Sequence, residues 1–166
     1  MSQSITVSPA ETTSYSVTVS DNGCFSEPDE ITVTVIPTPI EASAGQDVSI
    51  CQGESTVLTA SGGSDYVWST GETTQSITVN PGSTTTYTVI VSEGNATDSD
   101  SVVVTVNPIP TANAGVDVTI NEGESTTLTA SGGSTFEWST GETTQSITVN
   151  PSETTTYSVL VTENGC

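Results

Sequence analysis

The stretch WSTGETTQSITVNP occupies residues 68–81 and returns without a single change at residues 138–151. Around this stretch, residues 44–96 align with residues 114–166 without a gap at an offset of 70, and 37 of these 53 positions are identical. Identity over so long a stretch at a fixed spacing indicates a repeated structural unit. The sequence therefore predicts tandem copies of one domain of about 70 residues.

A third, partial copy comes first, because residues 3–19 repeat the pattern of residues 75–91. We divide the chain into an N-terminal part (1–37, the end of one copy), a central part (38–108, a complete copy) and a C-terminal part (109–166, a copy without its final strand). Proline pairs separate the three parts and favour extended, semi-rigid spacers, so we expect a rod. We expect this chain to be an excerpt of a longer array; the alternative is that a neighbouring molecule donates the missing strand.

Within the central part the apolar residues alternate with polar ones at a period of two. Tyr87, Val89 and Val91 alternate with small or polar neighbours, and turns rich in Gly, Asn and Pro interrupt the short runs. This pattern predicts an all-β sandwich without helices. We expect strands at residues 47–50, 55–60, 66–69, 75–80, 85–92 and 101–106, and in the N-terminal part at residues 4–7, 13–19 and 30–35.

The charge excludes several classes of protein. The chain has 20 Asp and Glu residues, no Lys, Arg or His, and a net charge of −20. It therefore lacks the cations that bind nucleic acid and the side chains that most enzymes use as a base or as a cationic clamp. Because these side chains are absent, we expect no enzyme. No apolar run approaches the length of a membrane span, so we also expect no direct membrane insertion. If the protein is exported, we expect the signal to lie outside this chain.

The motifs resemble a known family. Residues 66–72 (YVWSTGE), which follow a Gly-Glu-rich turn, resemble a PKD domain, and residues 62–89 together with the ending Asn164-Gly165-Cys166 resemble SprB-type repeats. Such repeats occur in very large surface adhesins of gliding Bacteroidetes. The resemblance implies an immunoglobulin-like sandwich, export by the type IX route and a stalk or adhesive role at the bacterial cell surface. Glu72 and Glu142 depart from it, because PKD domains often carry Asp there.

The aromatic residues have two interpretations. Trp68 and Trp138 either pack in the sandwich core or form platforms on which sugars stack, and we favour the core, together with Tyr87 and Tyr157. Tyr66 and Phe136 precede the tryptophans by two residues on the same strand face, and we expect them to be partly buried.

The carboxylates suggest a candidate calcium site. Calcium binds six to eight oxygen ligands, and we expect Glu41, Asp65 and the loop of Asp98 and Asp100 to meet at the end of the central part that faces the preceding copy. We expect Asp98 and Asp100 to have no counterpart elsewhere in the chain. The alternative is that all four are solvated surface charges.

The three cysteines occupy two positions of the repeat. Cys24 and Cys166 share one position, and Cys51 occupies another. No complete copy contains both, so a disulfide within one copy is excluded, whereas a Cys24–Cys51 bridge between copies stays open.

These observations favour a non-catalytic stalk segment of an extracellular repeat adhesin or surface filament. Its partners would be neighbouring repeats or identical subunits, and surface glycans are a further candidate. The alternative is a carbohydrate-binding module of a secreted polysaccharide-degrading enzyme, for which glycan binding would depend on Tyr66 or Phe136.

Overall fold

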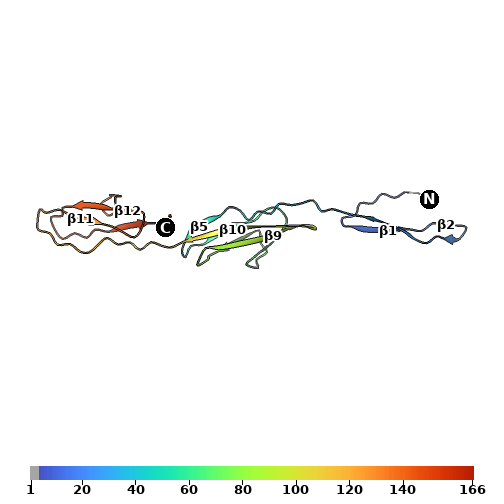
Figure 1. Cartoon of the computed structure of the whole chain (residues 1–166), viewed down its shortest axis with the longest axis horizontal. Helices are drawn as coiled ribbons and strands as arrows, with labels where there is room; N and C mark the ends of the chain where they lie inside the picture. The colour runs from blue at the N-terminus through green and yellow to red at the C-terminus, as the bar shows by residue number, and fades with distance from the viewer. Residues whose placement is uncertain (1–3) are drawn as a thin grey trace.

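The computed structural model describes residues 4–166 and consists of strands joined by turns and loops, with no helix in this range. The predicted all-β class is confirmed. Along the longest axis of the molecule the N-terminal part lies at one end, the central part in the middle and the C-terminal part at the other end (Figure 1). Accordingly, residues 4–166 contain no helix that is long and apolar enough to cross a membrane.

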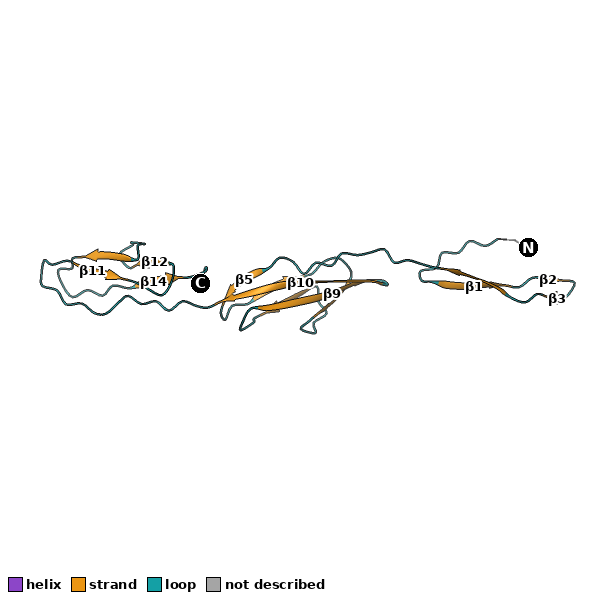
Figure 2. Ribbon diagram, viewed as in Figure 1, coloured by secondary structure: helices purple, strands orange, loops and turns teal. Residues whose placement is uncertain are grey.

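The central part has two sheets that share one core, which is consistent with a β-sandwich (Figure 2). One sheet has the strand order β5-β10-β9-β7, in which β10 runs parallel to β5 and antiparallel to β9; the other pairs β6 with β8. The strands are β5 (Val48–Cys51), β6 (Thr56–Thr59), β7 (Asp65–Trp68), β8 (Ser76–Val79), β9 (Thr85–Glu93) and β10 (Ala96–Asn107).

The core follows from the alternation in the sequence. In β9, Val89 and Val91 are fully buried while Ile90 between them is half exposed. Leu58 and Ile77 from the two-stranded sheet pack against the same cluster. Each fully buried apolar side chain of this size contributes about 1.5–3 kcal/mol. No buried residue in the described range is polar or charged, so this small core depends on apolar packing.

One strand boundary is clearly wrong in the prediction. We expected a strand at residues 101–106, but β10 begins at Ala96 and pairs with β9 directly after the tight turn at Gly94 and Asn95. Gly94 has a φ of +58°, which a glycine adopts at little cost. The ladder therefore continues through the polar residues 97–101, which carry no apolar alternation for sequence analysis to detect.

The C-terminal part repeats half of this arrangement. Its strands are β11 (Thr126–Thr129), β12 (Thr135–Trp138), β13 (Ser146–Val149) and β14 (Val159–Thr162). β11 pairs with β13 and β12 with β14, in the registers of β6–β8 and β7–β9 shifted by 70 residues. Residues 118–121, which correspond to β5, form no strand.

The N-terminal part forms one interrupted hairpin, in which β1 (Thr13–Val17) pairs with β4 (Asp29–Val33) and, nearer the turn, β2 (Ser20–Asp21) pairs with β3 (Cys24–Phe25). In the β1–β4 pair, Tyr15 lies opposite Ile31, as Tyr87 lies opposite Val102 in β9–β10. The strand expected at residues 4–7 does not form, and no residue from 4 to 37 is buried. Residues 1–3, with which this part begins, lie outside the described residues.

Gly62 gives a first testable prediction. Its φ is +113°, and a Cβ at this position would overlap the backbone carbonyl of Glu41. Gly62→Ala should therefore lower the free energy of unfolding of the central part by at least about 2 kcal/mol, measured by urea denaturation. Gly82→Ala is the control, because its Cβ would meet no atom within 4 Å and its φ is not positive. An equal loss in both variants would contradict the argument.

Candidate functional site

The carboxylates of Asp98 and Asp100 fasten the start of the central part to β10. Asp98 Oδ2 accepts a hydrogen bond from the backbone N–H of Ala42 (2.8 Å), and Asp100 Oδ2 accepts one from Ala44 (2.9 Å). Both residues lie within the strand and not in a loop, contrary to our expectation. The hydrogen bond from Ala42, and then the one from Ser99, lower the pKa of Asp98 from its usual 3.8, and desolvation opposes them more weakly. These two carboxylates therefore have a structural role.

The other two predicted calcium ligands are exposed. Glu41 directly precedes Ala42 in the sequence. The carboxylate of Asp65 accepts a hydrogen bond from the neighbouring Ser64 hydroxyl, at 3.1 Å. Within residues 4–166 no group of three or more acidic or cysteine side chains has a geometry that could hold a metal ion. The calcium site stays a prediction.

The lowered pKa of Asp98 predicts a pH dependence. The pKa of the Asp98 carboxyl group is lower in the folded state than in the unfolded state. The ionised carboxylate therefore stabilises the folded state at any pH above the unfolded-state pKa. This stabilisation is lost as the pH falls through the folded-state pKa. Asp98→Asn should therefore be less stable than the unmodified chain at neutral pH, and the difference should vanish well below pH 3.8. Urea midpoints at both pH values test this, with Asp65→Asn as control. A difference that is constant with pH would contradict it.

The tryptophans lie in the two cores. Trp68 and Trp138 are each 2% exposed, and each indole N–H donates to a backbone carbonyl, of Thr74 and Thr144 respectively, at 3.0 Å. A sugar ring cannot stack on faces that are covered in this way. Tyr87 is buried, whereas Tyr157, its counterpart, is only half-buried.

Tyr66 and Phe136 are half-buried, as expected. The Tyr66 hydroxyl donates to the carbonyl of Gly63 at 2.6 Å, which holds the ring against the sheet. Phe136 retains some accessible surface beside Leu160, which is 65% exposed. These two rings are the aromatic residues of the sandwich strands that remain for a glycan to contact.

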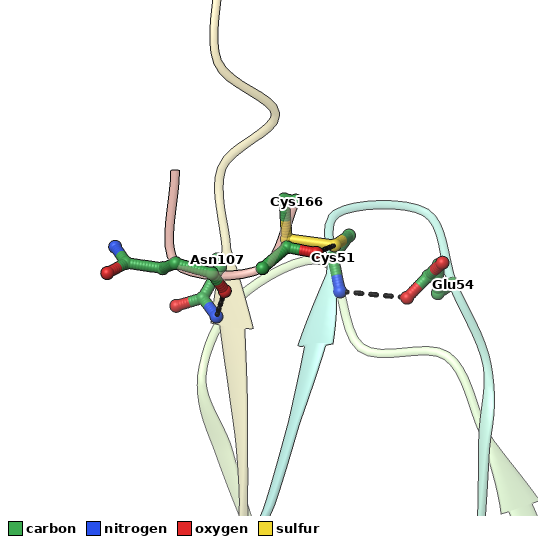
Figure 3. Close-up of a disulfide and its surroundings, with 6 residues drawn as sticks. Cys51, Glu54, Asn107 and Cys166 are labelled. Carbon is green, nitrogen blue, oxygen red and sulfur yellow. Dashed lines mark hydrogen bonds between the residues drawn. A yellow bond between two sulfur atoms is a disulfide. The ribbon is translucent and has the colours of Figure 1, made fainter. Parts of the chain in front are cut away.

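A disulfide joins the central and C-terminal parts (Figure 3). Cys51 at the end of β5 is bonded to Cys166, 115 residues later, with a Cα–Cα distance of 5.5 Å. The Cys24–Cys51 alternative is wrong, because Cys24 is free and exposed. Beside the disulfide, the Asn107 side chain donates to the backbone carbonyl of Asn164 at 3.3 Å (Figure 3).

Local structure explains how Cys166 reaches its partner. Asn164 and Gly165 both have positive φ and form a tight turn after β14, closed by two hydrogen bonds between the backbones of Glu163 and Cys166. This turn lies beside the end of β5 in the preceding part. Sequence analysis identified both repeat positions, but the pairing follows only from the way consecutive parts meet.

The C-terminal part also has an open groove with a volume of about 560 Å³. Residues 116–122 form one border and residues 151–157 the other, and Leu128, Trp138 and Val149 also line it. In the central part the corresponding borders are β5 and the start of β9, and β10 fills the space between them. The groove therefore lies where a final strand would complete the sheet.

Neither a scan against protein-family models nor a search of the curated proteins found a match for this chain.

Proposed function

We propose that the chain is a non-catalytic stalk segment of an extracellular repeat protein of the PKD-like or SprB type, which holds a binding region away from a bacterial cell surface. The junction between the central and C-terminal parts is the observation that carries this proposal. The Cys51–Cys166 disulfide and the Asn107–Asn164 hydrogen bond link the central part to the C-terminal part. An enzyme or a single binding module does not need such a link between consecutive repeats.

Three further observations support the proposal. The parts follow one another along the long axis of the molecule, as a rod of tandem repeats requires (Figure 1). A disulfide persists in oxidising surroundings such as the exterior of a cell. The net charge of −20 keeps neighbouring stalks apart, and the absence of Lys and Arg leaves trypsin-like proteases without a cleavage site.

Small-angle scattering tests the shape that this function needs. A compact chain of this length has a radius of gyration of roughly 15 Å, and a rod should exceed this value by at least about half. The Cys51→Ser variant should bend more freely at the junction and give a broader distribution of distances, while Cys24→Ser should match the unmodified chain. A compact particle would overturn the stalk proposal. Glycan binding that Phe136→Ala abolishes would instead favour the carbohydrate-binding module.

A further inference from the structure

Asn95 stands in a sequence triplet that accepts N-linked glycans. The triplet is Asn-x-Ser or Asn-x-Thr with any residue except proline in the middle, and it marks surface segments of secreted proteins. Of the eight asparagines in the chain, Asn95 alone fulfils this rule, together with Ala96 and Thr97. The otherwise suitable triplet that begins at Asn150 is excluded, because Pro151 occupies its middle position.

The triplet lies at the tip of the hairpin formed by β9 and β10. Gly94 and Asn95 make the tight turn, and Ala96 and Thr97 are the first two residues of β10. The side chain of Ala96 is buried, whereas Asn95 and Thr97 on either side of it are exposed. The amide and the hydroxyl that define the triplet are therefore both accessible to an enzyme.

The side-chain amide of Asn95 is also free of other contacts, since it has no hydrogen-bond partner within residues 4–166. Asn80 and Asn150 differ, because the Nδ2 atom of each donates to two backbone carbonyls at 2.8 to 3.1 Å. A sugar bonded to the nitrogen of Asn80 or Asn150 would disturb hydrogen bonds that hold neighbouring turns together. A sugar bonded to Asn95 would disturb none.

The tip stays accessible where two parts of the chain are joined. In the C-terminal part Gly165 occupies the position of Asn95, next to Cys166 and its disulfide with Cys51. Gly165 is nevertheless exposed, and a Cβ placed on it would meet no atom within 4 Å. A side chain at this position therefore has room even when the tip lies against a preceding part, so the site is open in a repeat array as well.

We propose that Asn95 carries an N-linked glycan, which an oligosaccharyltransferase attaches from a glycosyl diphosphate donor. The Nδ2 atom of Asn95 forms a bond to the anomeric carbon of the sugar, and the bond between this carbon and the diphosphate oxygen breaks. The diphosphate leaves with the bonding electrons, and Nδ2 gives up one proton. This inference rests on the extracellular location in the proposed function, because such glycans are attached to secreted proteins.

The first experiment is mass spectrometry of the protein isolated from the cells that produce it. A protease that cleaves after Glu releases residues 94–122, which contain this triplet and no other. The peptide should carry a glycan. An amidase specific for N-linked glycans, used in heavy-oxygen water, should then convert the side chain of Asn95 to a labelled carboxylate. A peptide of unmodified mass would overturn the proposal.

The second experiment uses the purified folded chain, an oligosaccharyltransferase and a lipid-linked oligosaccharide diphosphate, so its result does not depend on the location of the protein. Thr97→Ser keeps the triplet and should be glycosylated like the unmodified chain. Thr97→Val removes the hydroxyl but fits a strand equally well, and it should lose the modification. Failure of the unmodified chain to react, or an equal reaction of Thr97→Val, would count against the proposal.

Pro151→Ala is the matched control for the contacts of the amide, because it creates the same kind of triplet at Asn150. In the folded variant Asn150 should stay unmodified while Asn95 reacts, since the Asn150 amide is held by two backbone carbonyls. Equal modification of both asparagines would contradict the structural argument. An elongated chain without a glycan would overturn this inference alone, and a compact chain would overturn the stalk proposal alone.

Discussion

Trp68→Ala is expected to lower the free energy of unfolding of the central part by about 3–5 kcal/mol. The indole is 2% exposed, lies in the core cluster shared by both sheets and donates a hydrogen bond to Thr74. Alanine removes these contacts and leaves a cavity in a domain whose total stability is only roughly 4–10 kcal/mol. The variant should therefore be partly unfolded, which urea titration followed by circular dichroism will measure.

Val67→Ala is the matched control, since Val67 is the adjacent residue on the same strand but faces solvent and is 49% exposed. Its effect should stay within about 0.5 kcal/mol. The fluorescence of Trp138, the tryptophan that remains in Trp68→Ala, reports separately on the C-terminal part. If Trp68→Ala and Val67→Ala were equally stable, our assignment of Trp68 to the core would be wrong.

Breaking the Cys51–Cys166 disulfide should have the second large effect. The bond closes a loop across 115 residues, and such a constraint on the unfolded chain stabilises the folded state by typically 2–4 kcal/mol. Cys166→Ser should lower the free energy of unfolding by this amount and should separate the unfolding of the C-terminal part from that of the central part. Thermal and urea denaturation, each followed by tryptophan fluorescence and by circular dichroism, measure both changes.

Cys24→Ser is the control for this prediction, because Cys24 is exposed and unbonded. A reducing agent should destabilise the unmodified chain and Cys24→Ser equally, and it should not affect Cys166→Ser. Destabilisation of Cys166→Ser by the reducing agent would mean that Cys51 pairs with a different thiol.

The class of fold was predictable because it depends on local pattern. Alternation around Tyr87, Val89 and Val91 can bury one face only in a strand, and the resulting sheet indeed buries Val89 and Val91 completely. The strands of the central part were placed to within one or two residues except β10, whose first half is polar and whose pairing depends on the turn at Gly94. The strand expected at residues 4–7 does not form. The acidic residues were harder to interpret, because a carboxylate can bind calcium, water or a backbone N–H with the same sequence pattern.

The all-β class, the repeat of about 70 residues and the candidate core positions could be inferred from the amino-acid sequence, because periodicity and identity are properties of local stretches of residues. Three features required the three-dimensional structure: Cys51 pairs with Cys166, Asp98 and Asp100 accept hydrogen bonds from the N–H groups of Ala42 and Ala44, and a groove opens beside Tyr157. Each of these depends on which segments come together from far apart in the chain. That arrangement is set by the packing of whole sheets and by the way one part meets the next, and neither is encoded in a local pattern.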